Sequence, residues 1–216
     1  MTFEVSYVGT LGEPVVVLDD FHPYPEHLRA MAGRSRFGRL GPHYPGVQAG
    51  ADPRHLEPVE RVVTEVLREV FGAEAAPKVV QCSFSLVSVP DGELAPIQRL
   101  PHVDTVDPGR VALLHYLSGT GGGTAFYRHR STELEVLSEE TFPVFREALE
   151  QEGMPKAGYM RGSDSRFEMI GEVEAVPNRA VLYRSRLLHS GKIAEGFGFS
   201  GKPEEGRLTL NTFFQV

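Results

Sequence analysis

From Lys78 to the C-terminus, the chain consists of short runs rich in β-branched and aromatic residues, separated by turn-forming residues. The longest run, KVVQCSFSLVSV, covers 78–89. The other runs are 96–100, 111–118, 123–127, 167–173, 179–183 and 207–214. Glycine and proline, which punctuate strands, account for 23 and 16 of the 216 residues. Several short strands joined by turns predict a mainly β fold: a sandwich, a barrel or a jelly roll.

The residues before Lys78 carry helical signals instead. Pro25 to Ala32 is a short candidate helix. Asp52-Pro53 starts a second one, in which apolar residues recur at spacings of three and four, so we expect an amphipathic helix over 53–71. The intervening segment 33–50 is rich in glycine and is expected to be irregular.

These patterns indicate one domain over residues 1–216. We expect residues 1–77 to form a helical and irregular support region and 78–216 to form the β core. A helix near 139–151 interrupts the strands as an insertion.

Composition excludes several classes of protein. With 22 basic and 29 acidic side chains the formal charge is −7, which argues against nonspecific binding to nucleic acid or to an anionic membrane. The N-terminal residues do not resemble a signal peptide, and no run of about 20 apolar residues is present. The single cysteine, Cys82, suits a reducing compartment, so we expect a cytoplasmic protein whose metal ligands are His, Asp and Glu.

Two of the eight histidines stand two residues before an acid. His55 and Glu57 lie within the expected helix, where positions i and i+2 point in different directions. His102 and Asp104 follow Pro101, which favours extended backbone, and in an extended chain i and i+2 share a face. Only the second pair can chelate one ion.

A His and a carboxylate from one strand end, joined by a distant His, form the facial triad of non-haem iron enzymes. The third ligand is then His115, His129 or His189. His115 lies within an apolar strand and is more typical of a core or surface residue, and His129 lies in a basic run. His189 follows a strand candidate by a few residues, and we favour it.

The chain from about Pro96 onward resembles the Fe(II)/2-oxoglutarate-dependent dioxygenases, and within them the prolyl-hydroxylase-like branch. The resemblance rests on the order and spacing of five segments. They are PHVD (101–104), RVALLHYL (110–117), GGGTAFY (121–127), PNRAVLYRSRLLHSG (177–191) and RLTLNTFF (207–214). It implies a double-stranded β-helix, a jelly-roll and cupin-like core with supporting helices, in a bacterial branch of the superfamily.

The resemblance also implies roles for individual residues. His102, Asp104 and His189 correspond to the catalytic iron ligands, and Arg207 to the cation that binds the distal carboxylate of 2-oxoglutarate. A bidentate arginine suits that carboxylate. Tyr116 and Thr209 are expected to donate further hydrogen bonds to it. The implied cofactors are Fe(II), 2-oxoglutarate as cosubstrate and dioxygen.

Four further residues are candidates for contact with the substrate. Arg128 and Arg130, with Arg184 and Arg186 on a second segment, form a basic patch in an acidic protein. Both segments lead toward the expected iron site, so Arg128, Arg130 and Arg186 are candidate ligands for an acidic group. Tyr44, in the irregular segment, is a candidate for capping the pocket.

The expected activity is therefore hydroxylation of an unactivated carbon of an amino acid, peptide or natural product, with succinate and carbon dioxide as co-products. A desaturation or a further oxidation derived from this hydroxylation is also expected within this class of reaction. Two alternatives stay open: a cupin-like metalloprotein with non-oxidative chemistry, and a noncatalytic ligand-binding barrel. Expected partners are a small-molecule or peptide substrate, without nucleic acid or membrane, and a homodimer is compatible with the sequence.

Overall fold

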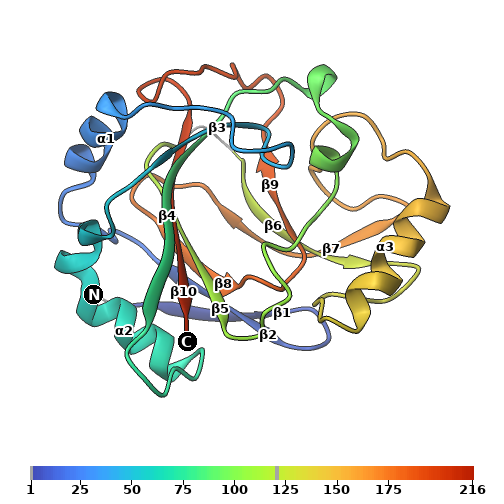
Figure 1. The fold of residues 1–216 in the computed structure, drawn as a ribbon, viewed down its shortest axis with the longest axis horizontal. Coiled ribbons are helices and arrows are strands. Elements are labelled where there is room, and N and C mark those ends of the chain that lie inside the picture. The colour runs from blue at the N-terminus through green and yellow to red at the C-terminus, as the bar shows by residue number, and fades with distance from the viewer. Residues whose placement is uncertain (1, 120–121) are drawn as a thin grey trace.

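The computed structural model of the protein describes residues 2–119 and 122–216 and contains two antiparallel sheets (Figure 1). In spatial order, the larger sheet contains β1 (Glu4–Val8), β2 (Glu13–Leu18), β8 (Ala180–Arg184), β5 (Arg110–Tyr116), β10 (Arg207–Gln215), β4 (Lys78–Val87) and β3 (Gly46–Gly50). The smaller one contains β7 (Phe167–Glu174), β6 (Gly122–His129) and β9 (His189–Ile193). The mainly β fold expected from the sequence is confirmed.

The two sheets pack face to face. Tyr116 and Tyr183 from the larger sheet and Phe126 and Val173 from the smaller one belong to a single buried cluster. Because side chains alternate along a strand, the residues between them point to the outer faces of the sheets. The inner face is the one that can hold an enclosed site.

Helices cover both outer faces (Figure 1). On the larger sheet, the 3-10 helix η1 (Pro53–Val59) and α2 (Glu60–Glu69) belong to one buried cluster with Val111 and Leu113 of β5. On the smaller sheet, α3 (Thr141–Glu152) buries Phe145 beside Tyr127 of β6. The remaining helices are α1 (Pro25–Arg34), η2 (Asp91–Glu93) and η3 (Pro96–Arg99). Within residues 2–119 and 122–216, none of the helices has the length and apolarity needed to span a bilayer.

Two predicted elements differ from the structure. The helix expected over 53–71 is divided into η1 and α2, because Pro58 has no backbone N–H to donate and the α-helix begins only at Glu60. The strand expected over 96–100 is wrong, since Pro96–Arg99 is a 3-10 helix. There the Gln98 side chain accepts a hydrogen bond of 3.0 Å from the Ala95 N–H, which stabilises the turn.

The N-terminal region also contributes more than helical support. It supplies β1 and β2 at one edge of the larger sheet and β3 at the other. The strand β3 lies inside the glycine-rich segment that was expected to be irregular, and it pairs with β4 so that Gly46 faces Val87. Glycine has a low intrinsic strand propensity, so only the neighbouring strand makes this segment extended.

Two glycines at the start of β6 allow the backbones of β7 and β9 to approach it closely. A Cβ atom on Gly122 would lie 1.9 Å from the carbonyl oxygen of Lys192, and one on Gly123 would lie 2.0 Å from that of Val173. Any larger residue would therefore push β9 or β7 away from β6. The preceding glycine, Gly121, lies outside the described residues.

A buried histidine on the outer face of β5 is part of the structural core. The Nε2–H of His115 donates to Oδ1 of Asn178 at 3.0 Å, and the same oxygen accepts from the His22 N–H at 3.0 Å. His115 is fully buried, and burial is the main reason that its pKa falls to about 3. Its ring is therefore neutral in the folded protein at any moderate pH.

We expect this residue to make the protein sensitive to acid. Below a pH of about 6.5 the unfolded chain binds a proton at His115 that the folded protein excludes. The free energy of unfolding therefore decreases as the pH is lowered, by about 2 kcal/mol at pH 5 relative to neutral pH. In denaturant titrations, the loss of unfolding free energy between pH 7.5 and pH 5 should be smaller in His115→Gln by this amount. His27→Gln, on the exposed face of α1, should keep the full loss, and an equal loss in His115→Gln would contradict the assignment.

Candidate metal and cosubstrate site

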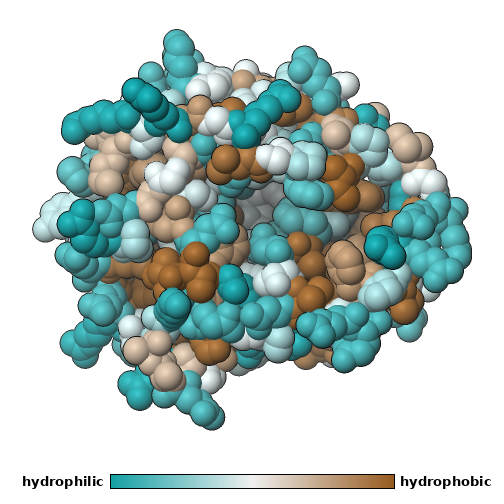
Figure 2. All heavy atoms as spheres, in the orientation of Figure 1, coloured by the Kyte–Doolittle hydropathy of each residue, from teal (hydrophilic) through white to brown (hydrophobic). Residues whose placement is uncertain are grey.

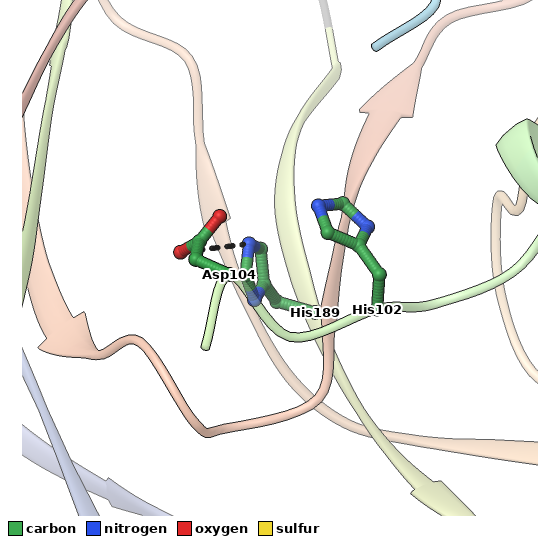
Figure 3. A group of neighbouring side chains, drawn as sticks. All are labelled: His102, Asp104 and His189. Carbon is green, nitrogen blue, oxygen red and sulfur yellow. Dashed lines mark ion pairs between the residues drawn. The ribbon is translucent and has the colours of Figure 1, made fainter. Parts of the chain in front are cut away.

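Three predicted ligands meet at one place. One ligand atom from each of His102, Asp104 and His189 can be chosen so that all lie within 4.8 Å of one another. Figure 3 shows the three side chains gathered together, with His189 next to the carboxylate of Asp104. Among the described residues no other group of three His, Cys, Asp or Glu side chains has this arrangement.

Backbone pairing holds the ligands in place. His102 N–H donates to the carbonyl of His189 at 2.9 Å, and His189 N–H donates back to that of His102 at 2.9 Å. Asp104 N–H donates to the carbonyl of Ser185, also at 2.9 Å. The segment after Pro101 is thus extended at His102, as the sequence predicted, and it is joined to the start of β9.

The hydrogen bonds of His189 decide which of its nitrogens can bind a metal. Its Nδ1 lies 2.9 Å from the carbonyl oxygen of Leu187, which can only accept, so Nδ1 carries the proton. Nε2 is then unprotonated, and it lies 3.7 Å from Oδ2 of Asp104. A backbone carbonyl that orients a histidine in this way is typical of metal ligands.

The electrostatics of the cluster also fit a cation. Burial lowers the pKa of His189 to about 4, so its ring is neutral. Loss of hydration within the cluster raises the pKa of Asp104 to about 6, although Asp104 is more exposed to solvent than His189. His102 is more exposed to solvent than His189, although its pKa also falls, chiefly through the loss of hydration. Two neutral imidazoles and one carboxylate that is costly to ionise are the donor set of a divalent transition metal, because the cation stabilises the carboxylate.

Arg207 is buried inside the barrel without an anionic partner. Arg207 is 4% exposed as a residue. Its guanidinium donates from Nη2 to the carbonyl of Gly123 at 2.8 Å and lies 5.5 Å from the ring centroid of Tyr116. Its Nε has no hydrogen-bond partner, and no carboxylate of residues 2–119 and 122–216 forms an ion pair with it. A buried, unpaired charge costs several kcal/mol, so this position fits a carboxylate ligand.

The structure brings Tyr116 and Thr209 next to Arg207. Thr209 pairs with Tyr116 across β10 and β5, and it follows Arg207 by two positions, so the three share the inner face. The Tyr116 hydroxyl is already bonded to Oγ1 of Thr124 at 2.6 Å, and the ring of Tyr116 contacts the guanidinium. Tyr116 therefore holds Arg207 in position in addition to any hydrogen bond to a ligand.

The predicted arginines of the substrate site lie in ion pairs or at the surface. Arg128 pairs with the buried Glu135 at 2.7 Å, and Arg186 lies 3.8 Å from Glu13. Arg130 is exposed and donates to the carbonyl of Asp164 at 3.0 Å. Because Arg128 and Arg186 already have carboxylate partners, an acidic substrate group would have to compete for them.

The other predicted residues separate into two groups. The hydroxyl of Tyr44 is buried and has no partner among the described residues, so it stays a candidate for ligand contact. His115 lies on the outer face of β5, and His129 binds Thr132 and Glu152 near α3. Neither belongs to the cluster of His102, Asp104 and His189.

The sequence patterns did not predict the aromatic side chains that pack against His189. The ring of Tyr183 lies 4.8 Å from that of His189 and 5.2 Å from that of Phe126. Strand alternation could have placed Tyr183 inside the barrel, because it falls two residues after Val181 in an apolar strand. Its proximity to His189, from the following strand, depends on the turn between them.

A family model covers almost the whole chain. Residues 1–214 match DUF6445, a family of unknown function, and the protein belongs to that family. No curated protein matches the sequence.

Solved structures show which fold this family member has. A Pseudomonas putida prolyl-4-hydroxylase is similar over 95% of this chain and 94% of its own, with 15% identity and a TM-score of 0.51. Iron-bound HygX from Streptomyces hygroscopicus is similar over 93% and 81%, with 14% identity and a TM-score of 0.52. The non-heme alpha ketoglutarate dependent epimerase SnoN, from nogalamycin biosynthesis, is similar over 94% and 78%, with 11% identity and a TM-score of 0.51. The chain therefore has the fold of the Fe(II)/2-oxoglutarate oxygenases, a double-stranded β-helix.

We expect each ligand to be needed for metal binding. Replacing His189 by Ala removes one of three donors, so affinity for Fe(II), Co(II) or Ni(II) should fall at least about tenfold. Metal content by mass spectrometry after dialysis, together with titration of the apoprotein, measures the change. His27→Ala, on exposed α1, is the matched control, and unchanged stoichiometry in His189→Ala would remove it from the ligand set.

Proposed function

We propose that the protein is an Fe(II)- and 2-oxoglutarate-dependent oxygenase that hydroxylates an unactivated carbon. The observation that carries this proposal is the buried, unpaired Arg207 in the same barrel as the His102, Asp104 and His189 cluster. One site suits a divalent metal and the other a carboxylate. A cosubstrate with a metal-chelating keto acid at one end and a carboxylate at the other matches both.

The residues of the chain have separate tasks in this reaction. His102, Asp104 and His189 hold the metal, and Arg207 binds the far carboxylate of 2-oxoglutarate, supported by Tyr116 and Thr209. Tyr183 and Phe126 exclude water behind His189. When bound, Fe(II) supplies the activation of dioxygen: one oxygen atom enters the substrate as a hydroxyl, and the other enters succinate as 2-oxoglutarate loses carbon dioxide.

Arg207 also distinguishes this proposal from its alternatives. A cupin-like metalloprotein with non-oxidative chemistry needs the metal ligands, but it does not need a buried cation on the inner face. A noncatalytic binding barrel needs neither. The substrate classes compatible with the fold are amino acids, peptides and natural products. We further propose a cytoplasmic site of action, because the single cysteine, Cys82, is a free thiol. A bacterial source is proposed only from the resemblance of the sequence to a bacterial branch of the oxygenases.

The first test is binding and turnover of 2-oxoglutarate. The iron-loaded protein should bind 2-oxoglutarate under nitrogen and release succinate slowly in air. In Arg207→Ala the affinity for 2-oxoglutarate should fall roughly 10²-fold, because a charge-assisted bidentate contact is lost from a buried site. Metal content should stay the same, and Arg68→Ala, on the exposed face of α2, should bind 2-oxoglutarate normally. A 2-oxoglutarate titration that is unaltered in Arg207→Ala would show that the cosubstrate pocket lies elsewhere.

The second test concerns the outcome of the reaction. Halogenases of this superfamily have a small residue in place of the carboxylate ligand, and this chain has Asp104. With a product in hand, mass spectrometry after reaction under labelled dioxygen in chloride buffer should show one labelled oxygen and no chlorine. A chlorinated product would refute the proposed outcome, and a product of unchanged mass would indicate an epimerisation, the reaction named for SnoN.

A further inference from the structure

The inner face of β3, β4 and β10 carries a continuous group of uncharged polar side chains. Strand pairing aligns Gln48, Ser85 and Thr209 in one row and Gly50, Ser83 and Asn211 in the next. Thr209 and Asn211 follow Arg207 on β10 by two and four positions, so both rows share a face with Arg207. We call Gln48, Ser83, Ser85 and Asn211 the polar floor.

Two atoms of the polar floor lack a hydrogen-bond partner. Ser85 Oγ accepts from Gln48 Nε2 at 2.9 Å and from Asn211 Nδ2 at 3.2 Å. The other amide atom of Asn211, Oδ1, is buried and unbonded among the described residues, as is the hydroxyl of Ser83, a residue that is only 4% exposed. Leaving such groups unsatisfied costs about 1–3 kcal/mol each, so they are suited to a ligand that bonds to them.

The hydroxyl of Tyr44 adjoins this group. Burial raises the pKa of Tyr44 to about 12. The positive charge of Arg207 and the nearby Ser85 hydroxyl act in the opposite direction, because both stabilise the phenolate. In spite of this proximity the Tyr44 hydroxyl has no hydrogen-bond partner of normal geometry among the described residues. It is neutral at physiological pH and can donate or accept.

The polar floor is distinct from the carboxylate site at Arg207. Within the rows of paired residues that contain Gly46, Gln48 and Gly50, Arg207 is the one charged residue. Asn211 follows it by four positions, which is about 13 Å along a strand. A carboxylate held by Arg207 is therefore too far from Asn211 to bond to it, and the unbonded atoms of Asn211 and Ser83 require a second group.

Space is present beside these groups. Gly50 faces Ser83 in the register, and a Cβ atom built on Gly50 would meet no atom within 4 Å. Figure 2 shows this side of the molecule hollowed near its centre, between the positions of β4 and of β6 and β9 in Figure 1. Gln48, Asn211 and Tyr44 are each partly exposed, so a ligand entering from solvent can reach them.

We infer that the polar floor is the substrate subsite and that it binds an uncharged portion of the substrate rich in carboxamide or hydroxyl groups. This rests on the proposed function, because the floor lies on the inner face of the same barrel as the metal and cosubstrate residues. Serine and tyrosine hydroxyls and amide side chains both donate and accept, so they match neutral groups of the same kind. A charged group bound here would lose its hydration without gaining a counter-charge.

The test uses calorimetric titration of protein loaded with Ni(II), which avoids turnover. The first titration is with 2-oxoglutarate alone. The loaded complex is then titrated with two neutral probe sets, N-acetyl amino-acid amides and methyl glycosides, and with their charged counterparts, the free amino acids and uronic acids. At least one neutral set should bind tenfold or more tightly than its counterpart, and the set that binds identifies the group as carboxamide or hydroxyl.

Variants connect that binding to the polar floor. Ser83→Ala and Asn211→Leu should each weaken the neutral probe tenfold or more and leave 2-oxoglutarate affinity unchanged. Ser83→Ala should not lower the melting temperature, since the hydroxyl that it removes has no partner in the folded chain. Thr212→Val is the matched control, because Thr212 is buried on the same strand but pairs with Cys82 and so faces the opposite side of the sheet.

Each outcome is decisive for one proposal or the other. If 2-oxoglutarate binds but only charged probes bind, or no neutral probe does, the subsite is refuted while the proposed function stands. Neutral binding that is unchanged in both Ser83→Ala and Asn211→Leu also refutes the subsite. If 2-oxoglutarate does not bind but the Ni(II)-loaded protein binds neutral probes through Ser83 and Asn211, the proposed oxygenase function fails, and the polar floor remains a binding site for neutral groups.

Discussion

The reciprocal backbone hydrogen bonds between His102 and His189 are the contact on which the candidate site depends. They join a segment near the middle of the chain to the first residue of β9, and they bring two imidazoles and the carboxylate of Asp104 within coordinating distance. Backbone pairing is more rigid than side-chain contact, since it fixes both chain direction and register. A metal site built on such a pair is preorganised before any ion binds.

The interior of the barrel combines this cluster with polar groups that the fold does not satisfy. Arg207 lacks a carboxylate among the described residues, and Ser83 and Asn211 have unbonded oxygens. An apolar interior would be more stable, so these groups are better explained by ligands than by folding. The stabilising apolar core lies on the outer faces, where α2 and α3 cover the sheets, and in the cluster of Tyr116, Phe126 and Tyr183 between the sheets.

Local patterns predicted much of this structure, and their failures have physical causes. Runs rich in β-branched and aromatic residues predicted the strands of the core, and a proline followed by His102 predicted the extended segment. The strand expected over 96–100 is a 3-10 helix because proline and the capping side chain of Gln98 favour a turn. The strand β3 was missed because its glycines become extended only by pairing with β4.

The sequence by itself determined the class of fold, placed His102 and Asp104 on one face of an extended segment, and predicted which residue types could bind a metal and a carboxylate. These follow from periodicity and from side-chain chemistry, which act over a few residues. Only the tertiary structure decided that His189, and not His115 or His129, completes the cluster. It also decided which polar side chains lack partners, because a hydrogen bond between distant strands depends on register and sheet packing, which no local pattern encodes.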